Sequence, residues 1–192
     1  MNHAIYLARH ASPQLGWADP YNVMPGPPLS DLGRRQAGEL AGYLAGESVT
    51  IVYASPFARA RETAQQVAER VGCPVVESAG LREGGPGETI DDVRLRVLGV
   101  WRQIVENGHE GPVAIVSHGT PVKVVLESLD DGSAQLGRYL FDYGNPLPPG
   151  GAWRAVPRRP RWQLELAFKP SEILHAGHLR CDGRPFGAPI AR

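Results

Sequence analysis

Polar side chains with catalytic potential stand just beyond the short apolar runs of this chain. They are two arginines, two histidines and one glutamate: Arg9, His10, Arg59, Glu83 and His118. A phosphoryl group in transfer carries negative charge on three oxygens. The guanidinium group of arginine supplies paired N–H donors to such oxygens. A neutral histidine is a nucleophile toward phosphorus, and a carboxylic acid can protonate the departing oxygen. Together these residue types indicate phosphoryl transfer.

The apolar runs predict the elements that hold these side chains. Runs at 5–8, 51–54, 74–76 and 113–116 have the length of buried strands, and they alternate with stretches of helical periodicity near 31–44, 60–71, 93–104 and 121–129. Strand and helix in alternation favour a mainly parallel sheet with helices on both faces. Ligands bind beyond the carboxyl ends of such strands, so we expect the polar residues to meet at one rim.

The last third of the chain breaks this alternation. Residues 152–156 and 162–168 alternate between apolar and polar side chains, which predicts an antiparallel hairpin at the sheet edge. The expected fold class is therefore α/β, a three-layer sandwich with a mainly parallel central sheet, flanking helices and a C-terminal edge hairpin. A length of 192 residues predicts a single domain over 1–192. Residues 169–192 form a tail to which the sequence assigns no element.

Composition excludes several classes of protein. Twenty basic and twenty acidic residues give a formal charge of zero, which disfavours nucleic acid as a partner. The chain contains no apolar stretch of about 20 residues, the length that a membrane span needs. The N-terminus lacks a secretory pattern, and Cys73 and Cys181 do not form a close pair. We therefore expect a cytoplasmic protein, with its oligomeric state left open.

The segments that carry the polar residues resemble the histidine phosphatase superfamily, in its phosphoglycerate-mutase-like branch. The resemblance runs from Ile5 to about Gly119, with a further similar stretch at 87–89 and 96–97. One such segment alone is a weak signal, whereas five in the same order are specific. The five segments are Leu-Ala-Arg-His-Ala (7–11), Leu-Ser-Asp-Leu-Gly-Arg-Arg-Gln-Ala (29–37), Ser-Pro-Phe-Ala-Arg-Ala-Arg-Glu-Thr-Ala (55–64), Leu-Arg-Glu (81–83) and Val-Ser-His-Gly (116–119).

The resemblance implies a role for each residue. His10 would attack phosphorus and become phosphohistidine, and Glu83 would act as general acid and then as general base. Arg9, Arg59 and His118 would line the phosphate pocket, with Ser55 beside it in a structural role. The substrate would be a small phosphorylated molecule, and neither a metal nor another cofactor would be required.

The chain departs from the family pattern at two places. Gly16 stands where the family often has a phosphate-contacting asparagine, and residues 84–86 lack the aromatic side chain often found after the acid. Glu88 lies on the same loop as Glu83, so the choice of general acid stays open, with Glu83 preferred. His175, His178 and Cys181 have a spacing compatible with a metal ion, but three ligands without a further pair are a weak argument for a metal site.

Three functions fit these residues. The leading hypothesis is a phosphomonoester hydrolase that acts through phosphohistidine. A mutase would use the same residues but return the phosphoryl group to its substrate, and the short chain leaves little room for the inserted segments of the glycolytic mutases. A non-catalytic phospho-ligand-binding protein is the third, although it would not need an acid beside a nucleophile. The loops 11–28 and 84–90 are expected to select the substrate, which the sequence does not identify.

Overall fold

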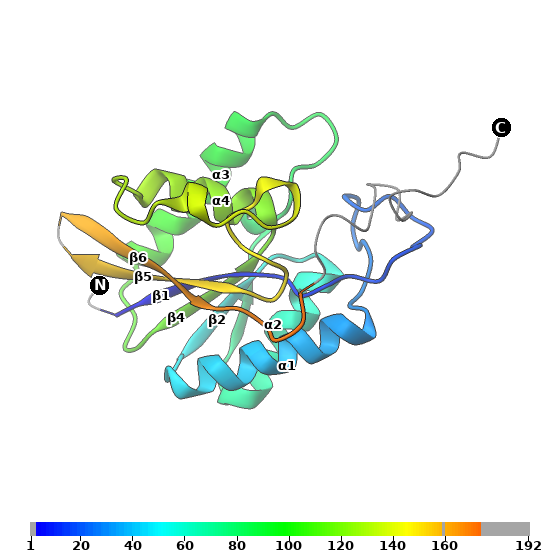
Figure 1. The fold of residues 1–192 in the computed structure, drawn as a ribbon, viewed down its shortest axis with the longest axis horizontal. Helices are drawn as coiled ribbons and strands as arrows, with labels where there is room; N and C mark the ends of the chain where they lie inside the picture. The colour runs from blue at the N-terminus through cyan, green and yellow to red at the C-terminus, as the bar shows by residue number, and fades with distance from the viewer. Residues whose placement is uncertain (1–2, 159, 174–192) are drawn as a thin grey trace.

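The computed structural model describes residues 3–158 and 160–173 (Figure 1). Its described residues form four α-helices and six strands, with three short 3₁₀ helices in the connections. The helices are α1 (Asp31–Gly46), α2 (Ala58–Val71), α3 (Ile90–Glu106) and α4 (Gly119–Leu129). The strands are β1 (Ile5–Arg9), β2 (Ile51–Ala54), β3 (Val75–Glu77), β4 (Val113–Ser117), β5 (Ala152–Arg158) and β6 (Arg161–Phe168).

All six strands belong to one sheet, in the order β3-β2-β4-β1-β5-β6. The first four in that order are parallel, whereas β5 runs antiparallel to β1 and β6 runs antiparallel to β5. The predicted fold class is confirmed, including the hairpin at the sheet edge. Parallel pairing brings the carboxyl ends of β1, β2 and β4 to the same rim, which is the arrangement needed to gather the polar residues.

Two helices cover each face of the sheet, with α1 and α2 on one side and α3 and α4 on the other (Figure 1). The surroundings of strand β1 explain why its residues 5–8 are all apolar. Tyr6 and Ala8 pack into the core below α1 and α2, while Ile5 and Leu7 pack into the core on the opposite face. A strand buried on both faces has no solvent side, so it reads as a continuous apolar run.

The helix boundaries follow local capping chemistry. Ser30 caps α1 by accepting a hydrogen bond from Gly33 N, and Thr89 and Asp92 form a reciprocal capping box at the start of α3. Helix α2 ends at Gly72, whose φ of 78° is in the left-handed region that glycine adopts easily. The start of α1 after Ser30 and the end of α2 at Gly72 match the expectation from the sequence. Helix α3 begins at Ile90, three residues before Val93, the first residue of the apolar face that predicted this helix.

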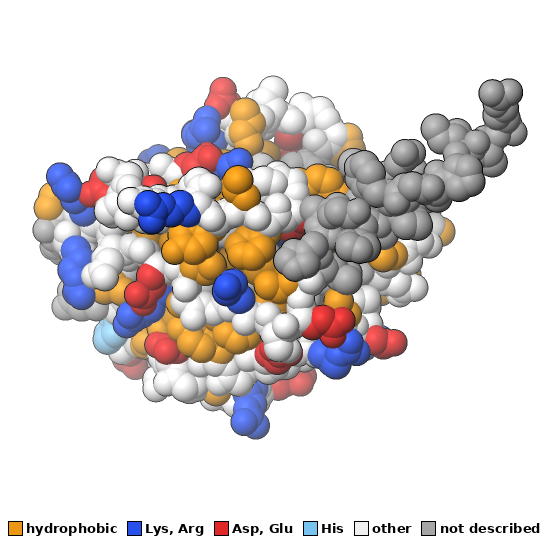
Figure 2. Space-filling view, viewed as in Figure 1, with side chains coloured by type: hydrophobic (Ala, Val, Ile, Leu, Met, Phe, Trp, Pro, Cys, Tyr) orange, Lys and Arg blue, Asp and Glu red, His pale blue; other side chains and the backbone are white. Residues whose placement is uncertain are grey.

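Charged groups of both signs are interspersed over the face shown in Figure 2, in line with a formal charge of zero. Within the described residues, none of the helices combines the length and the apolar content needed to cross a bilayer. In the same part of the chain, His, Cys, Asp and Glu side chains do not gather in threes as ligands for a metal ion. His175, His178 and Cys181, the spacing noted in the sequence, lie outside the described residues.

Candidate active site

Four of the predicted site residues meet at the carboxyl ends of β1 and β4 and at the start of α2. Arg9 is the last residue of β1 and His10 follows it, while Arg59 lies in the first turn of α2. His118 directly follows β4 and forms the N-cap of α4. We call these four residues, Arg9, His10, Arg59 and His118, the cationic cup.

The His10 imidazole is held in one tautomer. Its Nδ1 lies 2.7 Å from the carbonyl oxygen of Ala11, which can only accept, so Nδ1 carries the proton. Its Nε2 therefore presents a lone pair, and it accepts from Arg59 Nε at 3.2 Å. Burial first, and then the charges of Arg59 and Arg9, hold the pKa of His10 well below its usual value. The imidazole is neutral at physiological pH, which is the state a nucleophile requires.

Main-chain and side-chain contacts fix His10 in place. Its backbone N–H donates to Ser117 O at 2.8 Å, and its carbonyl accepts from Gly150 N at 3.1 Å. Thr63 Oγ1 accepts from Ala11 N at 3.1 Å and donates to the carbonyl of Arg59 at 2.7 Å. Thr63, which the sequence did not single out, therefore joins the end of β1 to the first turn of α2.

His118 faces the same cup. Its ring centroid lies 5.0 Å from that of His10, and its Nε2 lies 2.7 Å from Ser55 Oγ. Because Ser55 Oγ also accepts from Phe57 N, its hydrogen is free to be donated to Nε2. On this basis we assign the His118 proton to Nδ1 and Ser55 as a residue that orients His118. Burial, followed by the repulsion between the two rings if both were protonated and by the charges of Arg59 and Arg9, holds the pKa of His118 well below its usual value.

Arg59 is fully buried although it is charged. Its Nη1 donates to the carbonyl of Tyr21 at 3.1 Å, and its guanidinium carbon lies 4.1 Å from the Tyr21 ring centroid and 4.7 Å from that of Phe57. The loop can approach this closely because Gly26 has no side chain. A Cβ there would lie 2.8 Å from Arg59 Nη1, and its φ of 65° suits glycine. A cation in the first turn also adds to the positive end of the helix dipole.

Arg9 has a partner that the sequence analysis missed. Asp142 accepts from both of its terminal nitrogens, Nη1 at 2.6 Å and Nη2 at 2.7 Å, and Leu147 O accepts from Nη1 at 3.0 Å. Arg9 was expected to donate to a phosphate, whereas these bonds occupy three of its five N–H groups and leave those on Nε and one on Nη2. No local pattern could reveal this pair, because 133 residues separate its members.

Three donor atoms of the cup are buried and have no hydrogen-bond partner within the described part of the chain. They are Arg9 Nε, Arg59 Nη2 and His118 Nδ1. A buried polar group without a partner costs about 1–3 kcal/mol, and more when it is charged. Three such donors on the residues that accompany a nucleophilic imidazole are typical of a site built for an anion with several oxygens.

The two glutamates of the following loop differ in their surroundings. Glu88 accepts from Arg96 Nε at 2.9 Å and Nη2 at 3.0 Å and from Arg82 at 3.1 Å. The Arg96 bonds, and then a bond from Gly85 N, lower the pKa of Glu88 to about 2. We call this pair the Glu88–Arg96 clasp.

Glu83 is half-buried and has lighter contacts, accepting from Gly84 N at 2.9 Å and lying 3.5 Å from Thr120 N. Burial lowers the pKa of Arg59, and the charges of Tyr21 and Glu83 oppose that shift. The Glu83 carboxyl thus lies within electrostatic reach of Arg59. Glu88, with its pKa of about 2, has no proton to give near neutral pH, so Glu83 stays the predicted general acid.

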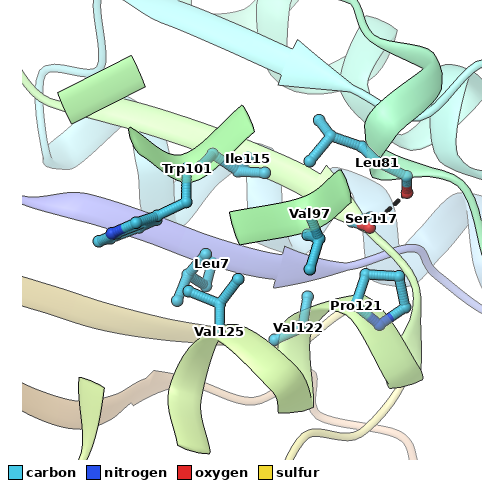
Figure 3. Close-up of a pocket in the computed structure, with 9 residues that line it drawn as sticks. All are labelled: Leu7, Leu81, Val97, Trp101, Ile115, Ser117, Pro121, Val122 and Val125. Atoms are coloured by element: carbon cyan, nitrogen blue, oxygen red, sulfur yellow. Dashed lines mark hydrogen bonds between the residues drawn. The ribbon is translucent and has the colours of Figure 1, made fainter. Parts of the chain in front are cut away.

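A small apolar cavity lies behind the cup, between the sheet and the α3–α4 pair (Figure 3). Its volume is about 10 Å³, close to the smallest space that holds one water molecule. Ser117 contributes the polar group of the lining, and its hydroxyl donates to Leu81 O at 2.7 Å. The cavity offers no charged group and belongs to the packing of the core.

A family model and several curated proteins are similar to this chain. The family model described as histidine phosphatase superfamily (branch 1) matches residues 5–87 and 83–143. Among curated proteins, the Mycobacterium tuberculosis "Bifunctional protein Rv2228c" is 32% identical over 173 residues, covering 72% of this chain and 47% of its own length. The chain thus spans about half of that relative. The Bacillus subtilis "Uncharacterized phosphatase PhoE" is 24% identical over 155 residues, covering 69% of this chain and 80% of its own.

Solved structures share the fold at lower identity. Bacillus stearothermophilus YhfR superposes with a TM-score of 0.65 at 21% identity, over 85% of this chain and 96% of that one. A mycobacterial glucosyl-3-phosphoglycerate phosphatase, Rv2419c, superposes with a TM-score of 0.64 at 19% identity, over 88% of this chain and all of that one (100%). At these identities the likeness concerns the fold.

Proposed function

Since this chain belongs to the histidine phosphatase superfamily (branch 1), we propose that it hydrolyses phosphomonoesters through a phosphohistidine formed on His10 Nε2. One observation carries the proposal: a buried, neutral imidazole presents its Nε2 lone pair in a cup with three donors that have no partner among residues 3–158 and 160–173. Relatives named as phosphatases support hydrolysis as the outcome. No metal is part of the proposed reaction.

In the first step, the Nε2 lone pair of His10 attacks phosphorus. An N–P bond forms as the P–O bond to the alcohol breaks, and Glu83 gives its proton to the departing oxygen. Nδ1 keeps its proton and its bond to the Ala11 carbonyl, so the imidazole stays oriented. Arg59 and His118 would donate to the phosphoryl oxygens as charge builds on them.

In the second step, a water molecule attacks phosphorus from the side that the alcohol has left. The Glu83 carboxylate takes the proton of that water, the N–P bond breaks, and its electron pair returns to Nε2. The products are inorganic phosphate and regenerated His10 and Glu83. A mutase would differ here, because the phosphohistidine would transfer its phosphoryl group back to an alcohol instead of water.

Trapping the intermediate tests the proposal. The enzyme is mixed with a radiolabelled aryl phosphate and quenched in alkali, since phosphohistidine is stable to base and labile to acid. We expect label on His10, and we expect inorganic phosphate to be released in step with the alcohol.

His109 provides a matched control, because it lies in a different loop and its ring contacts Tyr53. The variant His109→Gln should retain the label, and His10→Ala should lose it. Acid-stable label, or label on another residue, would show that the nucleophile is wrong. Transfer to an alcohol with little phosphate release would identify a mutase, and tight phosphate binding without turnover would identify a binding protein.

A further inference from the structure

The cup carries one uncompensated positive charge. Both imidazoles are neutral, so the positive charge comes from Arg9 and Arg59. Asp142 neutralises one of them through its two bonds to Arg9, with both side chains largely buried. Arg59 therefore carries the uncompensated charge of the cup.

Two described segments beside the cup, residues 11–28 and the loop that carries Glu83 and Glu88, do not supply an unpaired second cation. Residues 11–28 contain no lysine or arginine, and their one charged side chain is Asp19. Arg82 and Arg96, on the side of Glu83, both donate to Glu88. A second anionic group on a substrate would meet the carboxylates of Asp142 and Glu83 without a matching cation, and like charges at close range repel.

The wall next to Arg59 is apolar instead. The ring of Tyr21 lies over the guanidinium, and Pro25 O accepts from Ala58 N at 2.9 Å, which anchors the loop beside Arg59. Between these two anchors, Val23 and Met24 keep 44% and 55% of their surface exposed, and Tyr21 keeps 45%. Exposed apolar side chains on a loop that is anchored beside a charged site favour a ligand that is apolar beyond its charged group.

We propose, on the basis of the proposed function, that the substrates are phosphomonoesters of uncharged, apolar or aromatic alcohols, and that Asp142 is the residue that rejects alcohols carrying a second anion. The phosphoryl group lies in the cup, and the alcohol packs on the wall formed by Tyr21, Val23 and Met24. Asp142 acts through Arg9, by removing a charge that a second anionic group would otherwise use.

Three esters of primary alcohols separate the contributions, because their leaving groups are similar. Benzyl phosphate has an apolar alcohol, glycerol 3-phosphate a neutral polar one, and 3-phosphoglycerate an anionic group of the kind expected to be rejected. We expect kcat/KM to fall in that order, with the first exceeding the last by at least about tenfold. An equal or reversed order would overturn the proposal.

The variant Asp142→Asn tests the second half of the inference. Its amide oxygen can still accept from Arg9, but the carboxylate charge is gone. We expect the ratio of kcat/KM for 3-phosphoglycerate to that for benzyl phosphate to rise about fivefold or more. A residue that only positions Arg9 would lower both values together and leave their ratio unchanged, which would refute the specificity role. Asp131→Asn is the matched control, because Asp131 pairs with the remote Arg161.

The variant Met24→Ser tests the apolar wall. We expect kcat/KM for benzyl phosphate to fall about threefold to tenfold, while the value for glycerol 3-phosphate stays within about twofold. Leu95→Ser serves as control, because Leu95 is an exposed apolar residue of α3, with 74% of its surface exposed. An unchanged benzyl phosphate value in Met24→Ser would show that the alcohol does not pack on this wall.

These experiments separate the two proposals. If the proposed function fails, none of the three esters is turned over and His10 takes up no label. If the substrate inference alone fails, all three esters are hydrolysed through labelled His10, but the order or the response to Asp142→Asn differs from the expectation.

Discussion

The cationic cup and the Glu88–Arg96 clasp both contain a buried or largely buried arginine, but their surroundings differ. Arg96 donates to both oxygens of Glu88 and also to the carbonyls of Gly80, Arg82 and Glu83. Arg59 meets one carbonyl, one imidazole and two aromatic rings, and its Nη2 has no partner in the described part of the chain.

The difference shows how the same residue type serves two purposes. In the clasp, hydrogen bonds and charge are satisfied inside the fold, so its interaction energy stabilises the native state. In the cup, three donors are buried without a partner among the described residues, which lowers stability until an anion supplies acceptors. We therefore expect variants of the cup to affect catalysis, and variants of the clasp to affect stability.

The largest expected effect is that of His10→Ala on turnover. Without the Nε2 lone pair the phosphohistidine cannot form, so kcat should fall by roughly 10⁴-fold or more. The fold should persist, because the strand and helix contacts around the cup do not depend on the imidazole. Steady-state kinetics and circular dichroism measure the two consequences. Activity close to that of the wild type would remove His10 from the mechanism.

Exchanging each glutamate separates Glu83, the proposed general acid beside the cup, from the clasp in catalysis. Glu83→Gln should lower kcat/KM for an alkyl phosphate by about 10²–10⁴-fold, and much less for a nitrophenyl phosphate, whose leaving group needs no proton. Glu88→Gln should not alter this leaving-group dependence, because a carboxyl with a pKa of about 2 has no proton to donate near neutral pH. A leaving-group-dependent loss in Glu88→Gln would reverse the assignment.

Glu88, which we do not expect to act as the general acid, should instead matter for the stability of the fold. Glu88→Gln should lower the free energy of unfolding by about 2 kcal/mol at pH 7, as measured by urea denaturation, since it removes charged hydrogen bonds to Arg96. Asp91→Asn, which alters an exposed pair with Arg94, should change stability little. Equal losses in the two variants would contradict a stabilising role for the clasp.

The pH dependence of this loss has a defined sign. The folded pKa of Glu88 is about 2 and its ordinary value is 4.5, so unfolding takes up a proton between these pH values. The stability that Glu88 contributes is complete above pH 4.5 and disappears as pH falls toward 2. Wild type and Glu88→Gln should therefore converge in unfolding free energy across this window. A difference that persists at the acid end would indicate another cause.

The smallest expected effect is that of a chelator. In the proposed reaction, arginine charges and histidine donors take the place of a metal ion, so EDTA should leave kcat/KM unchanged for both aryl and alkyl phosphates. Loss of activity that a divalent cation restores would require a different mechanism.

Much of the fold could be predicted because its signals are local. The strands β1, β2 and β4 are short apolar runs buried on both faces or nearly so, and the sequence located each within one residue. Ser30 and Gly72 marked helix ends through contacts with their own neighbours in the chain. The partners of the cup gave no such signal. Asp142, Tyr21 and Thr63 lie in segments whose local patterns say nothing about Arg9 or Arg59.

The order of strands and helices, and the positions of His10, Arg59 and His118 at strand and helix ends, follow from the sequence alone, because periodicity and capping act over a few residues. Only the tertiary structure decided which charges are compensated. The Asp142–Arg9 pair, the Glu88–Arg96 clasp and the Tyr21 ring on Arg59 arise when distant segments are brought together by the sheet. Electrostatic interactions depend on distance and burial in space, and separation along the chain does not encode them.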